Sequence, residues 1–336
     1  MPRGIHNLGN TCFLNTCLQI LLHTYEIFSL PLELCNTNKI EAKIMEQLIL
    51  FQIEMMNGNV DAISPISLLQ WIKHIAQIQN RLLFTGYSQN DMSEFLLFFM
   101  DCMHICFQRP MDIQIQGKIE NETDEMATQC YSMISEMYKK EYSEIKHLFY
   151  GITVSRLIDT TTDKNILQTK SESFFILDLP IDGPNLYSCL HKYVTPELLE
   201  KDNAWFNEKT QQKQDVYKQN IFWSFPPILV ISLNRFYVEI ENNRMMKNMH
   251  LVDFPIDLLD LSSFVHGYNP SSFQYELYGI CNHMGDMTSG HYSAFVKTQQ
   301  KQWFHCNDEN IEIVGNENLN KMITPLAYCL FYRKKS

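Results

Sequence analysis

The sequence predicts an α+β protein whose helices come first and whose sheet follows. Three observations support this fold class. Apolar residues recur at helical spacing through roughly the first hundred residues, a polar stretch occupies the middle, and the last third consists of short apolar runs between glycine-containing turns. Because the two kinds of element are separated along the chain, we expect two packed parts with the active site between them.

Four helices are predicted in the first part. One begins near Cys12, where a polar loop leads into a nearly continuous apolar segment. Two more cover about 39–56, ended by Asn57-Gly58, and the segment opened by Ser64-Pro65 that runs to Ile75. The fourth runs from near Asp91 to about Phe107, and Glu94 three residues after Asp91 gives its start the character of a capping box.

The rest of the chain is predicted from alternation and short apolar runs. Residues 111–145 are polar and mixed, with a helix expected only around 131–138, and residues 196–220 show no clear periodicity. A polar turn is expected at 159–171, between two strands. The predicted strands cover 149–158, 174–180, 228–233, 275–280, 292–297, 303–306 and 328–332.

Composition and charge limit the classes of function. The 336 residues are 45% hydrophobic and 19% charged, which is typical of a globular protein with a large core. The net charge of -11 argues against binding to nucleic acid or to an anionic membrane, and permits attraction to a basic protein or peptide tail. We expect neither a signal peptide nor a membrane helix. The ten scattered cysteines include no C-x-x-C pair, which favours a reducing, intracellular location.

Cys12 is the candidate nucleophile. A thiol at a helix N-terminus meets the positive end of the helix dipole and unpaired backbone N–H groups, and both favour the thiolate. The alternative is a buried structural cysteine, which is the commoner role of a cysteine taken at random. The polar, glycine-containing loop before Cys12 favours the nucleophile.

His291 is the candidate general base, because a cysteine nucleophile needs a base and a group that orients it. It follows a glycine-containing loop and opens a predicted strand. Asn307 and Asp308 end the next predicted strand, and strands joined by a short connection lie side by side, so either side chain could reach the imidazole and fix its tautomer. The order of Cys, His and then Asn or Asp matches a papain-like arrangement, although the histidine lies farther from the cysteine than in small papain-like enzymes.

Five segments in sequence order resemble the ubiquitin-specific protease family of deubiquitinases. They cover residues 4–15, 86–96, 227–236, 252–255, and 275–296 together with 303–308. The resemblance implies a single catalytic domain over 1–336 with a papain-like fold. In this family-based division, about 1–145 form a helical thumb, about 146–225 a fingers-like insertion with palm strands, and about 226–336 a β-sheet palm.

The resemblance also implies roles for individual residues. Cys12 corresponds to the nucleophile, His291 to the general base, and Asn307 to the third member of the triad. Asp308 matches a neighbouring acidic residue that can assist. Asn7 matches the side chain that donates to the oxyanion of the tetrahedral intermediate.

The remaining site residues are assigned to the substrate by the same resemblance. Gln89, Asp91 and Glu94 correspond to positions that bind the arginine-bearing tail of ubiquitin, and Gly290 and Tyr292 to positions that line the channel for its Gly-Gly end. Each has a simpler alternative in the sequence itself. Asp91 and Glu94 could simply cap a helix, Gly290 could simply form a turn, and Tyr292 could be a core aromatic residue.

No metal or other cofactor is expected. Many family members hold zinc with two C-x-x-C pairs in the fingers region, but the corresponding stretches 159–164 and 206–209 contain no cysteine here. Cys102, His104 and Cys106 share one predicted helix, where core packing is favoured over metal binding.

The predicted function is hydrolysis after the C-terminal glycine of ubiquitin through a thioester, with ubiquitin and ubiquitinated proteins as partners. Two alternatives stay open: a peptidase for another ubiquitin-like modifier, and a non-catalytic ubiquitin-binding module. A transglutaminase also uses cysteine, histidine and aspartate, but it does not account for the order of these motifs. The sequence does not determine the oligomeric state and is compatible with a monomer.

Overall fold

The computed structural model describes residues 1–336 except 58–59, 87, 162–163, 240–241, 287–288 and 336. Some residues named in the predictions above therefore lie outside the described residues. They are Gly58 at a predicted helix end, Thr162 and Asp163 in the predicted turn, and Tyr87, Met287 and Thr288 within two of the motifs.

The four helices predicted in the first part are all present. The helix predicted from Cys12 begins at that residue, and the one predicted to start near Asp91 has Asp91 as its N-cap, accepting a hydrogen bond from Glu94 N at 3.0 Å. The helices are α1 (Cys12–Leu22), α2 (Tyr25–Phe28), α3 (Ala42–Asn57), α4 (Ile66–Ile78), α5 (Met92–Phe107), α6 (Glu122–Glu141), α7 (Glu144–Phe149) and α8 (Leu186–Val194).

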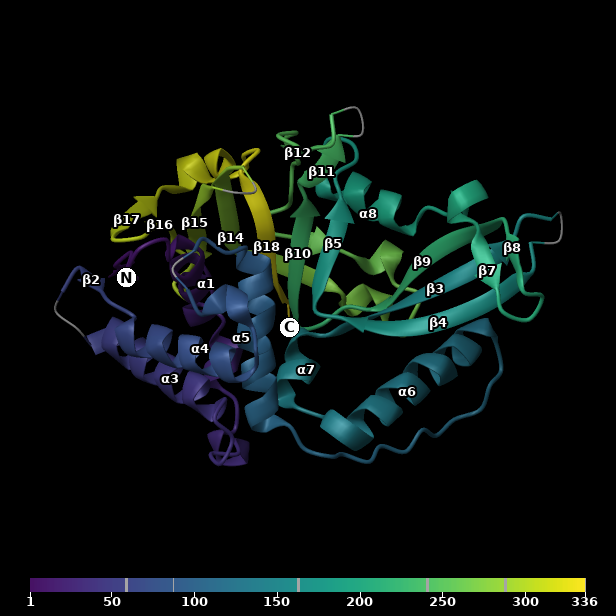
Figure 1. The fold of residues 1–336 in the computed structure, drawn as a ribbon, viewed down its shortest axis with the longest axis horizontal. Helices are drawn as coiled ribbons and strands as arrows, with labels where there is room; N and C mark the ends of the chain where they lie inside the picture. Colours follow the sequence, from purple (N-terminus) through teal and green to yellow (C-terminus); the bar gives the residue numbers. More distant parts are fainter. Residues whose placement is uncertain (58–59, 87, 162–163, 240–241, 287–288, 336) are drawn as a thin grey trace.

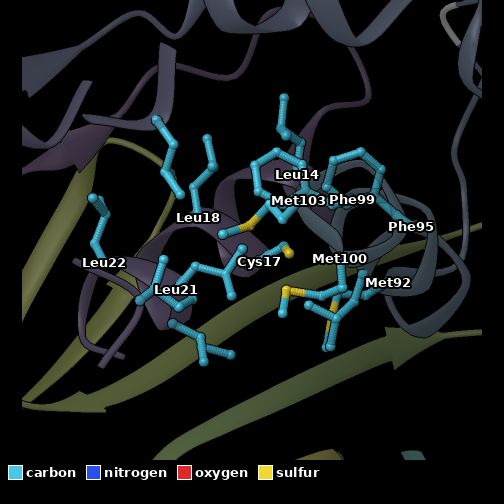
Figure 2. Packing of buried hydrophobic residues seen from close by; sticks show 14 of the residues in the cluster. Leu14, Cys17, Leu18, Leu21, Leu22, Met92, Phe95, Phe99, Met100 and Met103 are labelled. Atoms are coloured by element: carbon cyan, nitrogen blue, oxygen red, sulfur yellow. The ribbon is translucent and has the colours of Figure 1, made fainter. Parts of the chain in front are cut away.

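Helix α1 lies where the helical part of the molecule meets the sheet. Every residue of α1 is buried, because the helix lies between α5 on one side and the strands around β15 (Gly290–Lys297) on the other. Figure 2 shows Leu14 and Cys17 of α1 facing Phe99 and Met103 of α5. Burying each large apolar side chain contributes about 1.5–3 kcal/mol, so α1 holds Cys12 on a rigid support.

The main sheet carries the second half of the expected site. Its strands lie in the order β17-β16-β15-β14-β18-β10-β5, with β13 also paired to β14. The apolar strand predicted at 228–233 is β10, which pairs with β18 in antiparallel and with β5 in parallel orientation. The remaining bounds are β5 (Ile176–Pro180), β10 (Ile228–Asn234), β13 (Leu259–Asp260), β14 (Gln274–Gly285), β16 (Trp303–Asn307), β17 (Asn310–Val314) and β18 (Ala327–Lys334).

A second, outer sheet extends away from α1, α3, α4 and α5 (Figure 1). It contains β4 (Ile166–Phe174), β3 (Gly151–Asp159), β9 (Val216–Ser224) and β6 (Glu197–Leu199), in that order. Helix α6 lies along one face, where Met126 and Cys130 pack with Val154 and Trp223. The term outer sheet is used below for these strands together with α6.

The sequence predictions are wrong mainly in and around this outer sheet. Most of the polar turn expected at 159–171 is strand, because β4 already begins at Ile166. β4 is an edge strand with little buried surface, so its polar residues face solvent and hide the strand pattern. Helix α6 is longer than the predicted 131–138. Its start is capped by Asn121, which accepts a hydrogen bond from Asp124 N at 3.1 Å. Only one side of the helix is buried, so its apolar pattern in the sequence is weak.

Other short elements complete the chain. The segment 196–220, which showed no clear periodicity, contains part of the outer sheet and a small hairpin, and helix α8 was not predicted. The short strands are β1 (Gly4–Ile5), β2 (Ala62–Ile63), β7 (Trp205–Asn207), β8 (Gln212–Gln214), β11 (Phe236–Glu239) and β12 (Arg244–Lys247). The 3-10 helices are Leu32–Leu34, Leu82–Phe84, Lys201–Asn203, Ser262–Phe264, Pro270–Ser272 and Asn316–Met322.

The described part of the chain contains no helix that is both long and apolar enough to cross a bilayer. All ten cysteines are free thiols.

Candidate active site

The loop before Cys12 is shaped by its own side chains. Asn7 Oδ1 accepts hydrogen bonds from Gly9 N and Thr11 N, both at 3.1 Å, and Thr11 Oγ1 accepts one from Leu8 N at 2.9 Å. These bonds hold the turn that ends at Cys12, the first residue of α1. The loop is therefore ordered by local polar contacts rather than by apolar packing.

Cys12 is buried, with 2% of its surface exposed, and burial raises the pKa of its thiol above the ordinary value. Backbone N–H groups of Tyr292 and Phe13 act in the opposite direction, and the negative charge of Asp308 raises the pKa further. The expected preference for thiolate at the helix N-terminus is thus wrong for the resting structure. The helix N–H groups do stabilise the anion, but desolvation outweighs them.

His291 is the second residue of β15, and its ring is fixed by the neighbouring strand. His291 Nε2 lies 2.6 Å from Asn307 Oδ1, and 4.0 Å from Asp308 Oδ2. The antiparallel pairing of β15 with β16 brings these residues together. Because an amide oxygen only accepts, Nε2 carries the ring proton and Nδ1 is left as the basic nitrogen.

The structure brings Cys12 and His291 to the same place. One of the backbone N–H groups that act on the Cys12 sulfur belongs to Tyr292, the residue directly after His291. Within the described residues, the Cys12 sulfur makes no hydrogen bond to the His291 ring itself. The two groups are joined through the backbone of β15, against which α1 packs.

Asp308 stands between His291 and the loop of Asn7. It lies in the turn after β16 with a left-handed φ of 49°, and its carbonyl accepts a hydrogen bond from Ile5 N at 2.8 Å. Its carboxylate accepts one hydrogen bond from Asn7 Nδ2 at 2.9 Å, through Oδ2, and another from Asn15 Nδ2 at 2.7 Å, through Oδ1. Asn7 thus has its amide orientation fixed at both ends.

Close backbone approach explains two glycines of this region. A Cβ on Gly4 would lie 2.1 Å from the backbone oxygen of Glu309, and a Cβ on Gly290 would lie 2.2 Å from His283 Nε2. Atoms do not approach so closely without a shift of the backbone or ring. Both glycines therefore let separate segments meet beside the candidate site.

Gln89 and Gly290 make a reciprocal pair of hydrogen bonds. Gln89 Nε2 donates to Gly290 O, and Gly290 N donates to Gln89 Oε1, both at 2.8 Å. The side-chain amide of Gln89 thus holds the backbone one residue before His291. This contact adds a positioning effect to the substrate role that the resemblance implied for Gln89.

Asp91 uses both carboxylate oxygens. Oδ1 caps α5, while Oδ2 accepts from Tyr328 OH at 2.7 Å and from Tyr292 OH at 3.2 Å. Tyr292 is only 6% exposed, so its side chain is a core aromatic that also reaches Asp91. Glu94 is exposed and lines a surface pocket that also includes Leu97 and Asp101 of α5.

A polar cluster that the sequence did not predict lies beside Tyr292. Lys247 Nζ donates to His283 Nδ1 at 3.0 Å and to His283 O at 2.6 Å, and the His283 ring centre is 4.5 Å from that of Tyr292. Burial, reinforced by the charge of Lys247, lowers the pKa of His283 to about 4, so the ring is neutral at pH 7. The two residues belong to different segments, and only the fold shows that they meet.

Asn15 was also missed, although it left a signal. Like Thr16 and Gln19, it is a polar residue in a mostly apolar helix, and it is 2% exposed. Such a residue needs buried hydrogen-bond partners.

The described residues contain no group of three or more His, Cys, Asp or Glu side chains arranged to hold a metal. Cys102 and Cys106 are buried in α5, and His104 Nδ1 lies 2.7 Å from Ser143 Oγ.

Comparison with known proteins gives a consistent result. The model of the family described as ubiquitin carboxyl-terminal hydrolase matches residues 3–332. The chain is 29% identical over 343 residues to ubiquitin carboxyl-terminal hydrolase Usp2 of Drosophila melanogaster, covering 98% of this chain and 34% of that protein. It is 29% identical over 350 residues to ubiquitin carboxyl-terminal hydrolase 2 of Homo sapiens, covering 99% and 55%. The chain thus spans between 34% and 55% of the length of these two relatives.

Solved structures share the fold. One is a chain of the SAGA Ubp8/Sgf11/Sus1/Sgf73 DUB module bound to ubiquitin aldehyde, with a TM-score of 0.72, 25% identity, and coverage of 99% of this chain and 70% of that one. A chain of the module bound to monoubiquitin has a TM-score of 0.74 at 24% identity, covering 99% and 69%. The match over nearly the whole length agrees with the papain-like α+β fold expected from the motifs. The chain belongs to the ubiquitin carboxyl-terminal hydrolase family.

Proposed function

We propose that this chain is a thiol-dependent deubiquitinase that hydrolyses the bond after the C-terminal glycine of ubiquitin. The observation that carries the proposal is the meeting of Cys12 with the strand of His291, whose ring is held by Asn307 at 2.6 Å. Membership of the family supports the same reaction. The support comes from two independent directions, side-chain geometry and whole-chain similarity.

The first half of the reaction follows from the protonation states. Cys12 rests as a neutral thiol because its pKa is raised, so His291 Nδ1 must take its proton as the sulfur attacks the glycine carbonyl carbon. The S–C bond forms and the carbonyl electron pair moves to oxygen. That oxyanion accepts hydrogen bonds from Asn7 Nδ2 and from the backbone N–H of Cys12. The C–N bond then breaks, and the amine leaves with the proton returned by His291.

The second half repeats this chemistry with water. His291 Nδ1 removes a proton from water, and the oxygen attacks the carbonyl carbon of the thioester. The C–S bond breaks, the sulfur of Cys12 is reprotonated, and ubiquitin leaves with a free C-terminal carboxylate. Asn307 keeps Nε2 of His291 protonated throughout, so that Nδ1 always faces the reaction.

Recognition of ubiquitin is assigned to the residues beside this centre. Gln89, Asp91 and Glu94 supply amide and carboxylate groups at the start of α5, and the negative charge of the chain suits an arginine-bearing tail. Gly290 and Tyr292 form the backbone wall for the Gly-Gly end. The solved module bound to ubiquitin aldehyde supports ubiquitin as the partner, since it has the same fold.

The division of labour along the chain belongs to the same proposal. Residues 1–145 act as a thumb, 146–225 as fingers with palm strands, and 226–336 as a palm. The outer sheet is then the part that holds the folded body of ubiquitin. An intracellular location fits both the substrate and the free cysteines.

The test is hydrolysis of a fluorogenic C-terminal amide of ubiquitin. Wild type should release the fluorophore, and Cys12→Ala should not. Cys17→Ala is the matched control, because Cys17 is a buried thiol of the same helix, 1% exposed, and has no part in the proposed reaction. Equal activity of wild type and Cys12→Ala would refute the proposal.

A second measurement separates the alternative modifiers. Vinyl-electrophile probes built on ubiquitin and on other ubiquitin-like proteins should label Cys12 only when the modifier is recognised. We expect rapid labelling by the ubiquitin probe. Labelling only by a different modifier would move the substrate class, and binding of ubiquitin without labelling would favour a non-catalytic module.

A further inference from the structure

Asn15 lies one turn after Cys12 in α1, and its side chain reaches Asp308 of the candidate site. Its Nδ2 donates to Asp308 Oδ1 at 2.7 Å, to Ile5 O at 3.2 Å and to His6 O at 3.4 Å. It is 2% exposed, and its Oδ1 has no hydrogen-bond partner among the described residues. Such a buried amide is costly unless its donor groups are used well, so the contact with Asp308 is the one to explain.

The carboxylate of Asp308 is held at both oxygens. Oδ1 accepts from Asn15, Oδ2 accepts from Asn7 at 2.9 Å, and the same Oδ2 lies 4.0 Å from His291 Nε2. The hydrogen bond of His291 goes instead to Asn307. Asp308 is thus placed to orient Asn7 by a direct charge-assisted bond, and to act on His291 only through space.

We infer that Asn15 is a positioning residue for the oxyanion donor, acting through Asp308 on Asn7. The inference rests on the proposed function. A carboxylate attached by one rotatable bond can turn away from Asn7 unless its second oxygen is fixed, and Asn15 fixes it. Since Asn7 Oδ1 is occupied by N–H groups of the loop, the bond to Asp308 leaves the other N–H of Nδ2 to point at the developing oxyanion.

A purely structural role is the competing explanation, because Asn15 also ties α1 to the carbonyls of Ile5 and His6. The chain offers a matched control one turn later. Gln19 is likewise 2% exposed, donates to the backbone oxygen of Arg3 at 2.6 Å, and has a buried Oε1 without a partner among the described residues. It makes the same kind of tie between α1 and the N-terminal segment, but none to Asp308.

The experiment compares Asn15→Leu with Gln19→Leu in the ubiquitin amide assay and in thermal unfolding. Both variants should lower the melting temperature, since both leave backbone carbonyls of the N-terminal segment without their hydrogen-bond donor. Only Asn15→Leu should lower kcat, by about 10- to 100-fold, because it loosens one oxyanion donor. KM should stay within about threefold, and so should the Kd for ubiquitin measured on a Cys12→Ala background, because the reacting atoms and not the folded ubiquitin are affected.

A double-mutant cycle gives the decisive readout. If Asn15 acts through Asp308, Asn15→Leu should cost less than about threefold in kcat once Asp308→Ala is present. The same fold-loss in both backgrounds, or an equal loss for Gln19→Leu, would overturn the inference. Should Asn15→Leu fail to fold, Asn15→Ser, whose hydroxyl is too short to reach Asp308, takes its place in the cycle. Failure of the proposed function is distinct, because wild type itself would then show no turnover.

Discussion

The candidate site and the outer sheet are built in different ways. The site joins residues 4–11, the start of α1, the start of β15, and the end of β16 with the turn after it, and side-chain hydrogen bonds such as that of Asn7 with Asp308 hold these segments together. In the outer sheet, α6 packs on β3 and β9 through an apolar cluster. Polar contacts have strict directions and apolar contacts do not. Substitutions in the candidate site should therefore mainly lower kcat, and substitutions in the outer sheet should mainly lower the free energy of unfolding.

The largest effect should follow loss of His291, the proposed base. We expect His291→Ala to lower kcat for ubiquitin amide hydrolysis by about 10⁴-fold or more. The melting temperature should change little, because the ring is partly exposed and its loss leaves no cavity in the core. His305→Ala is the matched control on the neighbouring strand, where the ring stacks on Phe295. A comparable loss of kcat for His305→Ala would show that the effect is not specific to His291.

The opposite behaviour is expected in the outer sheet. Trp223 is 2% exposed and makes edge contacts with Tyr131 and Tyr268, at ring-centre distances of 6.0 and 5.7 Å. Trp223→Ala should lower the free energy of unfolding by about 3–5 kcal/mol, measured by chemical denaturation. The kcat of the folded fraction should be unchanged. A kcat that falls with full folding would show that the outer sheet also shapes the reacting atoms.

Substitutions of Asn307 and Asp308, the two residues beside His291, should lower kcat by different amounts. Asn307→Ala should lower kcat by about 10³-fold, because it removes the group that selects the tautomer at 2.6 Å. Asp308→Ala should lower it by about 10²-fold, since its 4.0 Å separation from the ring leaves mainly its effect on Asn7. Steady-state kinetics on both variants decide the order, and a larger loss for Asp308→Ala would make Asp308 the principal partner of the base.

The smallest effect is a shift in the reactivity of Cys12 with pH. Alkylation needs the thiolate, and the raised pKa means that its rate should rise towards a midpoint above that of an ordinary thiol. Asp308→Asn removes a negative charge that raises this pKa, so the midpoint should move to lower pH. Rates of iodoacetamide labelling, followed by mass spectrometry of the Cys12 peptide, test the direction. A shift to higher pH would contradict the assigned effect of Asp308.

The same contrast explains what the sequence could predict. The apolar periodicity of α1 and α5 was clear because both helices are buried on most sides, and the place of Asn307 followed from the adjacency of β15 and β16. The edge strand β4 and the one-sided helix α6 were poorly predicted, because partial burial leaves a weak pattern.

Two features of the site could not be read from local sequence. The contact of Asn7 with Asp308 joins residues about three hundred positions apart, and nothing near either residue specifies it. The raised pKa of Cys12 depends on how deeply the folded chain covers the thiol, whereas the helix N-terminus alone indicated the opposite direction.

The burial of the Cys12 thiol and its raised pKa bear on how easily the sulfur is oxidised. Hydrogen peroxide attacks thiolates, and the first product, a sulfenic acid, is followed by irreversible acids. A sulfur that stays protonated and 2% exposed is a poor target for that chemistry. In the resting protein, the Cys12 sulfur should therefore react slowly with oxidants. Small unselective electrophiles should be weak inactivators compared with those delivered on a ubiquitin tail.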